Sequence, residues 1–114
     1  MSLADKPCIP CRGGVPPLEG SRAEELLREL DDGWRLNGAG HLERSYAFEN
    51  FARAMAFANR VAAIAETEGH HPDLHVAWGL CRVEIWTHKI RGLTESDFYF
   101  AAKADRALEA TDGP

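Results

Sequence analysis

The chain has 114 residues, of which 45% are hydrophobic and 27% charged, and its formal net charge is −5. This length favours one domain with a modest core. The acidic balance, with no basic cluster longer than a pair, argues against direct nucleic-acid binding, which needs a concentrated Lys and Arg surface. No apolar run approaches the roughly 18 residues of a membrane-spanning helix. Three cysteines give no disulfide framework, and the N-terminus shows no apolar signal core, so we expect a soluble cytoplasmic protein.

The first twenty residues differ in composition from the rest of the chain. They hold four of the six prolines, and they contain a Cys8-x-x-Cys11 pair. We predict a flexible Pro/Gly-rich arm over residues 1–20 and a single folded domain over residues 21–114. The cysteine pair has half of a zinc-ribbon spacing, but no second pair follows it. Because structural zinc takes four ligands, we expect no metal at this pair.

The sequence predicts two helices between residues 21 and 68. Ser21 and Glu24 have the spacing of a capping box, which would open a short first helix at Ser21. Over residues 49–68, apolar side chains recur at spacings of three and four in two adjacent stripes, which predicts a long helix. Gly69 suits the left-handed position just past its end. So wide an apolar surface indicates burial against both a sheet and a partner chain.

Two hairpins and a last helix complete the predicted fold. Strands are expected over residues 34–37 and 42–48, and again over residues 74–78 and 81–87, where apolar and polar residues alternate. A final helix, capped at its first residue, is expected over residues 94–108. The order α-β-β-α-β-β-α predicts an α+β fold, with a four-stranded antiparallel sheet and helices packed on one face.

Histidines and acids gather in the second half of the chain. The run Glu66-Thr-Glu-Gly-His70-His71-Pro72 is followed by Trp86-Thr87-His88 and then by Gly92-Leu93-Thr94-x-x-Asp97. The two adjacent histidines should lie in the loop that enters the second hairpin, where the proline favours an extended conformation before it. His88 follows the far end of the same hairpin, so the layout returns it to the edge where the hairpin began. Trp86 shares its strand face and could wall a pocket.

This pattern resembles the signature of the pterin-4a-carbinolamine dehydratases, small cofactor-free enzymes that eliminate water from a hydroxylated pterin. Residues 48–66 are similar to the long central helix of that family, and Gly33-Trp34 is similar to its tryptophan near the pterin pocket. The resemblance implies catalytic roles for three histidines and supporting positions for an acid pair and a tryptophan. These residues are His70, His71 and His88, with Glu66, Asp97 and Trp34.

The implied chemistry suits histidine. Dehydration needs a proton for the departing hydroxyl and removal of another from a ring nitrogen, and the imidazole pKa of about 6.5 allows both. A neighbouring carboxylate can orient an imidazole. There is no redox change, so the resemblance implies neither metal nor other cofactor.

Some of these residues also have plainer interpretations. Asp97 could serve chiefly as a helix cap, Glu66 as a solvated residue and Trp34 as part of the core. His41 and His75 lie outside the pattern, and we interpret both as surface or strand residues.

The leading hypothesis is an enzyme that dehydrates 4a-hydroxytetrahydropterin to quinonoid dihydropterin, supporting pterin recycling. A second is the same pocket acting on another reduced pterin, in folate or molybdopterin-related metabolism. The rival is a non-catalytic protein, because the family includes members that stabilise a transcription factor's dimer and relatives that act as assembly factors for a large carboxylating enzyme. All three histidines are present, which favours the enzyme. The resemblance also implies a homo-dimer or tetramer and allows a protein client.

Overall fold

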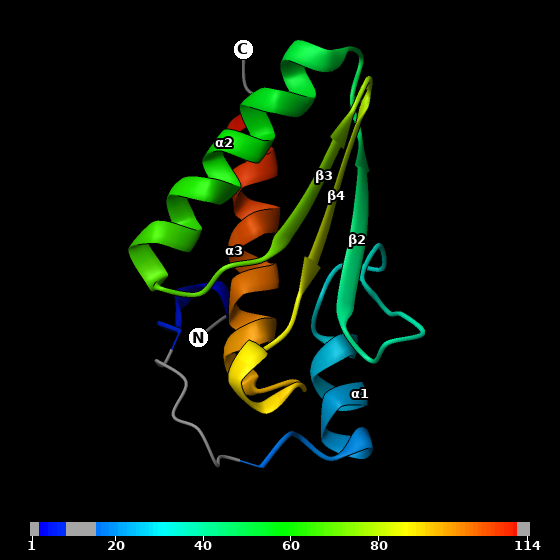
Figure 1. The fold of residues 1–114 in the computed structure, drawn as a ribbon, viewed down its shortest axis with the longest axis vertical. Coiled ribbons are helices and arrows are strands. Elements are labelled where there is room, and N and C mark those ends of the chain that lie inside the picture. The colour runs from blue at the N-terminus through cyan, green and yellow to red at the C-terminus, as the bar shows by residue number, and fades with distance from the viewer. Residues whose placement is uncertain (1–2, 9–15, 112–114) are drawn as a thin grey trace.

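The computed structural model describes residues 3–8 and 16–111. Its four strands form one antiparallel sheet in the order β1-β2-β4-β3. The strands are β1 (Arg35–Leu36), β2 (Leu42–Ala47), β3 (Asp73–Ala77) and β4 (Leu80–Ile85), and the helices are α1 (Gly20–Arg28), α2 (Phe51–Glu68) and α3 (Glu95–Thr111). Helices α2 and α3 lie on the same side of the sheet, and α1 lies near one end of it (Figure 1). The expected α+β architecture is therefore confirmed.

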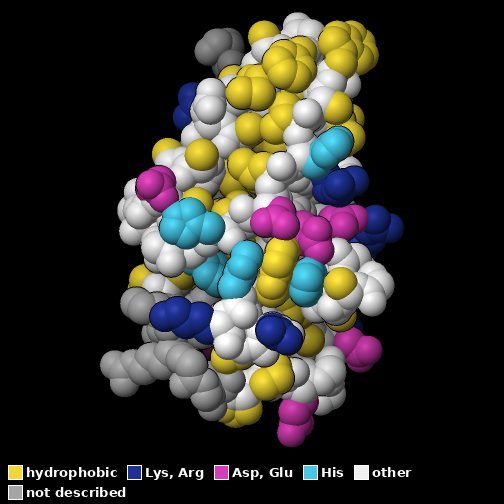
Figure 2. Space-filling view, in the orientation of Figure 1, with side chains coloured by type: hydrophobic (Ala, Val, Ile, Leu, Met, Phe, Trp, Pro, Cys, Tyr) yellow, Lys and Arg dark blue, Asp and Glu magenta, His cyan; other side chains and the backbone are white. Residues whose placement is uncertain are grey.

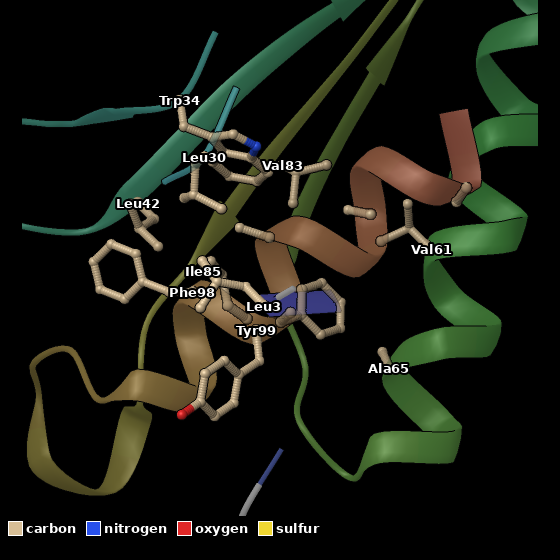
Figure 3. Packing of buried hydrophobic residues seen from close by; sticks show 14 of the residues in the cluster. Leu3, Leu30, Trp34, Leu42, Val61, Ala65, Val83, Ile85, Phe98 and Tyr99 are labelled. Carbon is tan, nitrogen blue, oxygen red and sulfur yellow. The ribbon is translucent and has the colours of Figure 1, made fainter. Parts of the chain in front are cut away.

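The core fills the space between the sheet and the two long helices. On β4, the side chains of Cys81, Val83 and Ile85 are fully buried, while the intervening Arg82 is exposed. This alternation directs one face of the strand to the helices. Figure 3 shows how α2 and α3 supply the other side of this core, which also includes a residue of the N-terminal segment. In the described part of the chain, no helix has the length and apolarity needed to cross a membrane.

The ends of α2 follow local sequence rules, whereas the start of α1 does not. The Asn50 side chain accepts a hydrogen bond from the Arg53 N–H at 2.9 Å, and Gly69 takes the expected left-handed conformation with φ of 65°. The capping box predicted at Ser21 is wrong, because α1 already begins at Gly20 and its N-cap makes no side-chain hydrogen bond. A tertiary contact precedes this helix instead, since the Leu18 N–H donates to the Leu93 carbonyl at 2.9 Å.

The described part of the expected N-terminal arm includes a packed segment. Leu3, Ala4 and Cys8 are buried, and the Cys8 N–H donates to Glu68 Oε1 at the end of α2 at 2.9 Å. Lys103 Nζ on α3 donates to the Ala4 carbonyl at 2.8 Å. Burial raises the pKa of the Cys8 thiol to about 12, so this thiol is protonated at neutral pH. The other cysteine of the pair lies outside the described residues.

A carboxylate in the middle of α3 ties that helix to the sheet. Asp105 accepts hydrogen bonds from Trp34 Nε1 at 3.0 Å, from Arg44 Nη1 at 2.8 Å and from the Tyr46 hydroxyl at 2.7 Å. Burial raises the pKa of this carboxyl above its usual range. Trp34 and Tyr46 are themselves buried, so the acid satisfies donors that have little access to water.

We predict that Asp105→Ala lowers the free energy of unfolding by roughly 2–4 kcal/mol, because it leaves the Trp34 and Tyr46 donors buried without an acceptor. Urea denaturation followed by circular dichroism measures this change. The control is Glu24→Ala, which removes an exposed acid of α1 and should stay within about 0.5 kcal/mol. Equal stability of the two variants would contradict the assigned role of Asp105.

Candidate active site

Asp97, in the first turn of α3, joins three separate segments of the chain. Its side chain is fully buried, and Oδ1 lies 2.6 Å from His70 Nε2. Oδ2 accepts from the Thr87 hydroxyl at 2.9 Å and from the Thr94 N–H at 2.8 Å. The last contact joins Asp97 to the backbone of Thr94, the residue expected to cap this helix, and corresponds to one half of a capping box. A buried carboxylate is costly unless it is paired, and these three donors supply the pairing.

His70 is held with one ring nitrogen turned inward. It follows the left-handed Gly69, and its backbone N–H donates to the Ala65 carbonyl at 3.2 Å. Its side chain is 12% exposed and lies edge-on to Phe100. Because an ionised carboxylate only accepts hydrogen bonds, the Nε2 that faces Asp97 carries a proton. Nδ1 is then the nitrogen that can exchange a proton with a substrate.

His71 points to a different environment from that of its neighbour. Its Nε2 lies 2.6 Å from Glu66 Oε2, and the two side chains are 62% and 78% exposed. Glu66 lies four residues before His70 in the sequence, but its carboxylate bonds the ring of His71. The ring of His70 is bonded instead to the buried Asp97. The two adjacent imidazoles therefore diverge, one into the protein and one toward solvent.

His88 lies at the end of the hairpin and stacks on an aromatic ring. It begins a single 3-10 turn, His88–Ile90, directly after Thr87, whose hydroxyl is bonded to Asp97. The His88 ring lies parallel to the Trp86 indole, with 4.3 Å between centroids and 10° between planes. Trp86, expected as a pocket wall, thus contacts a predicted catalytic residue directly. Figure 2 shows histidine side chains gathered beside hydrophobic and acidic ones on this face of the molecule.

Trp34 lies away from this group of histidines. It is 4% exposed, and its contacts are with Asp105 and Tyr46. Asp105 is eight residues beyond Asp97 on α3, which corresponds to about 12 Å along the helix axis. The structure therefore places Trp34 in the core, in agreement with the plainer interpretation of this residue.

Thr87 and His41 lie near the predicted catalytic histidines, although the sequence pattern assigned no role to Thr87 and we interpreted His41 as a surface or strand residue. Thr87 joins His88 to Asp97, and only its place beside a histidine hinted at a role. His41 stacks on the second face of Trp86, with centroids 3.9 Å apart, while His75 is an exposed residue of β3. No local pattern connects His41 to the motif, because it reaches Trp86 across the β2–β4 pairing. Among the residues that the structure describes, no group of three or more His, Cys, Asp and Glu side chains could hold a metal ion.

Comparison with known proteins gives a consistent result over almost the whole chain. The family model described as Pterin 4 alpha carbinolamine dehydratase matches residues 16–107. A provisionally named pterin-4-alpha-carbinolamine dehydratase from Rickettsia canadensis is 58% identical over 106 residues, which cover 93% of this chain and 97% of the relative. A protein of the same name from Rubrobacter xylanophilus is 54% identical over 104 residues, covering 91% and 96%.

A solved structure agrees with these sequence relatives. It is the crystal structure of a transcriptional coactivator/pterin dehydratase from Brucella melitensis, with a TM-score of 0.74 and 35% sequence identity. The match covers 80% of this chain and 97% of that one. The fold, the family model and the close relatives together show that this chain belongs to the pterin-4-alpha-carbinolamine dehydratase family.

Proposed function

We propose that this protein is a hydro-lyase that dehydrates 4a-hydroxytetrahydropterin to quinonoid dihydropterin by histidine acid/base catalysis, and so supports pterin recycling. The observation that carries the proposal is the hydrogen bond of 2.6 Å between His70 and the fully buried Asp97. A carboxylate that holds one imidazole nitrogen fixes the tautomer and the direction of the other nitrogen. This is how catalytic histidines are prepared for proton transfer.

The reaction requires two proton movements and no change of oxidation state overall. One imidazole gives a proton to the departing hydroxyl, which leaves as water when its bond to the ring carbon breaks. Another takes the proton from the adjacent ring nitrogen, and the electron pair of that N–H bond forms the new carbon–nitrogen double bond. We assign these transfers to His70, which precedes β3, and to His88, which follows β4. His71, exposed and paired with Glu66, binds the pterin or shares the transfer.

A second candidate function rests on the Brucella relative, which is described as a transcriptional coactivator as well as a pterin dehydratase. A purely assembling protein would use its surface and would need no buried carboxylate behind a histidine. The pairing of His70 with Asp97 therefore favours the enzyme. The deciding measurement is the disappearance of freshly generated 4a-hydroxytetrahydropterin with and without the protein.

We predict that His70→Ala and His88→Ala each lower the dehydration rate by roughly 10²-fold or more, the usual contribution of a placed acid or base. The rate is followed by the absorbance of freshly generated 4a-hydroxytetrahydropterin. His75→Ala is the matched control, because it removes an exposed histidine of β3 outside the cluster, and it should retain the parent rate. Parent-like turnover by folded His70 and His88 variants would refute the assignment.

Activity is expected to survive exhaustive chelation. The physical reason is that both steps are proton transfers between imidazoles and the substrate, which need no Lewis acid. Turnover is measured after dialysis against a strong chelator and again after zinc is added back. An enzyme that loses activity on dialysis and regains it with zinc would contradict this prediction.

We also propose a homo-dimer or a tetramer. One face of α2 buries Ala54, Phe57 and Val61 against the rest of the chain, yet Phe51 on the same helix is 48% exposed. Trp78, in the turn between β3 and β4, is 74% exposed. Among residues 3–8 and 16–111, no strand pairs with the outer edge of β1 or of β3. Apolar side chains and strand edges left in water favour association with another copy, with two-fold symmetry as the default.

Light scattering at micromolar concentration should therefore give a mass at least twice the 12.6 kDa of one chain. Met55→Glu places a charge beside Phe51 on the outer side of α2, and we expect it to weaken the assembly if this helix face is the interface. Thr67→Glu, at an exposed position near the end of the same helix, controls for the added charge. An intact oligomer in the Met55 variant would assign the contact to the strand edges, and a monomeric parent would refute association altogether.

A further inference from the structure

Three rings, two of them only two residues apart in the sequence and the third from the turn before β2, form a continuous stack. The Trp86 indole lies between two imidazoles, His88 on one face and His41 on the other. The planes are parallel to within 4° on the His41 side and 10° on the His88 side, with centroids 3.9 Å and 4.3 Å apart. Within the described part of the chain, no side chain hydrogen-bonds the His88 ring. Its orientation therefore depends on the Trp86 surface against which it lies.

His41 is fixed at the outer end of this stack by a hydrogen bond. Its Nδ1 lies 2.7 Å from Glu84 Oε2, and its side chain is 18% exposed. The Asn37 side-chain amide donates to the same oxygen at 2.8 Å, which orients the carboxylate. Since the carboxylate only accepts, Nδ1 carries the proton and the imidazole plane is held parallel to the indole.

The backbone before His41 is also fixed. The Asn37 side-chain oxygen accepts from the N–H groups of Ala39 at 3.0 Å and of His41 at 3.1 Å, and the Asn37 N–H donates to the His41 carbonyl at 2.9 Å. Gly40, between them, takes a φ of 79°, which glycine adopts without steric cost. One asparagine thus fixes both the turn that carries His41 and the carboxylate that orients its ring.

We propose that His41 is a positioning residue for the dehydration, acting through Trp86 to fix the ring of His88. This inference rests on the proposed function, because it assigns His41 a part in orienting a catalytic imidazole. Without His41, one face of the indole would be open to solvent, and Trp86 could rotate away from its present plane. His88 would then lose the surface that defines its direction. Small displacements of a reacting group are costly to the rate, and ground-state binding need not change.

His41 could also have a purely structural role, and the experiment must separate that role from the positioning of His88. Glu84 pairs with Glu43 on one side and with Asp73 on the other in the strand register, so three acids lie in a row across the sheet. Like charges directly opposite each other destabilise a sheet. In a purely structural role, the hydrogen bond from His41 to Glu84 would do no more than relieve this repulsion. That role would require the donor but not the ring.

The experiment compares three substitutions of His41 in the full chain. His41→Ala should lower kcat roughly 10-fold, with KM changed by less than about 3-fold, because the transition state and not the bound substrate is affected. His41→Phe keeps a ring for stacking and should restore kcat to within about 3-fold of the parent. His41→Gln keeps a donor for Glu84 and should resemble His41→Ala. Restoration by Gln but not by Phe would overturn the proposal in favour of the structural role.

A double-mutant cycle with Trp86 tests the route of action. If His41 acts only through the indole, then His41→Ala should have no further effect on kcat in a Trp86→Ala background. Independent, multiplicative losses in the double variant would overturn the proposal. His75→Ala, an exposed histidine outside the stack, is again the control and should leave both backgrounds unchanged.

A spectroscopic measurement separates this inference from the proposed function. The ring protons of His88 lie over the indole, so the ring current of Trp86 shifts their NMR resonances. His41→Ala and His41→Gln should move these resonances toward those of a free histidine, whereas His41→Phe should keep them near the parent positions. Unmoved His88 resonances in all three variants would overturn the positioning role even if the parent is active. A parent without dehydratase activity would refute the catalytic part, while moved resonances would still support the positional one.

Discussion

The buried carboxylate of Asp97 is the constraint on which the site depends. It is fully removed from water, and it is bonded to the loop after α2, to the end of β4 and to the N-terminus of α3. Removing these donors would leave an uncompensated charge in the interior, which costs several kcal/mol. The carboxylate therefore fixes the relative positions of His70 and Thr87, and through Thr87 the place where His88 begins. The same carboxylate bonds the N-terminus of α3 and a predicted catalytic histidine, so a capping role for Asp97 is compatible with the role proposed for it in the site.

The alternation of β4 separates the requirements of folding from those of chemistry. Cys81, Val83 and Ile85 face the helices and are fully buried, while Glu84 and Trp86 lie on the opposite face. Substitution on the first face changes packing, because interiors are close-packed. Substitution of Glu84 on the second face changes the row of acids and the partner of His41, whereas Trp86 belongs to the stack and also packs against the edge of the core. The period of two in a strand thus places core and stack residues on alternating positions of one short segment.

The sequence predicted those features that depend on neighbours in the chain. Gly69 ended a helix where expected, and the Asp97 side chain bonded the backbone N–H of Thr94, the residue expected before α3, because these contacts depend on groups only a few residues away. It could not predict that Glu66 would pair with His71, because that depends on the direction in which each imidazole leaves the loop. The contact of His41 with Trp86 likewise depends on the pairing of β2 with β4, which no local spacing encodes. The predicted start of α1 was wrong because a contact between residues far apart in the sequence, Leu18 and Leu93, precedes this helix.

The two adjacent histidines show how burial separates two groups of identical chemistry. Both place Nε2 at 2.6 Å from a carboxylate oxygen, but one carboxylate is fully buried and the other is 78% exposed. In the interior, the low dielectric strengthens the pair and few alternative partners exist, so the imidazole keeps one direction. At the surface, water and salt compete for both groups, so the pair is weak and can rearrange. A fixed ring suits the transfer of a proton to a defined atom, whereas a ring that can rearrange suits the capture of a substrate that arrives from solvent. The difference in burial between Asp97 and Glu66 thus supports different roles for His70 and His71.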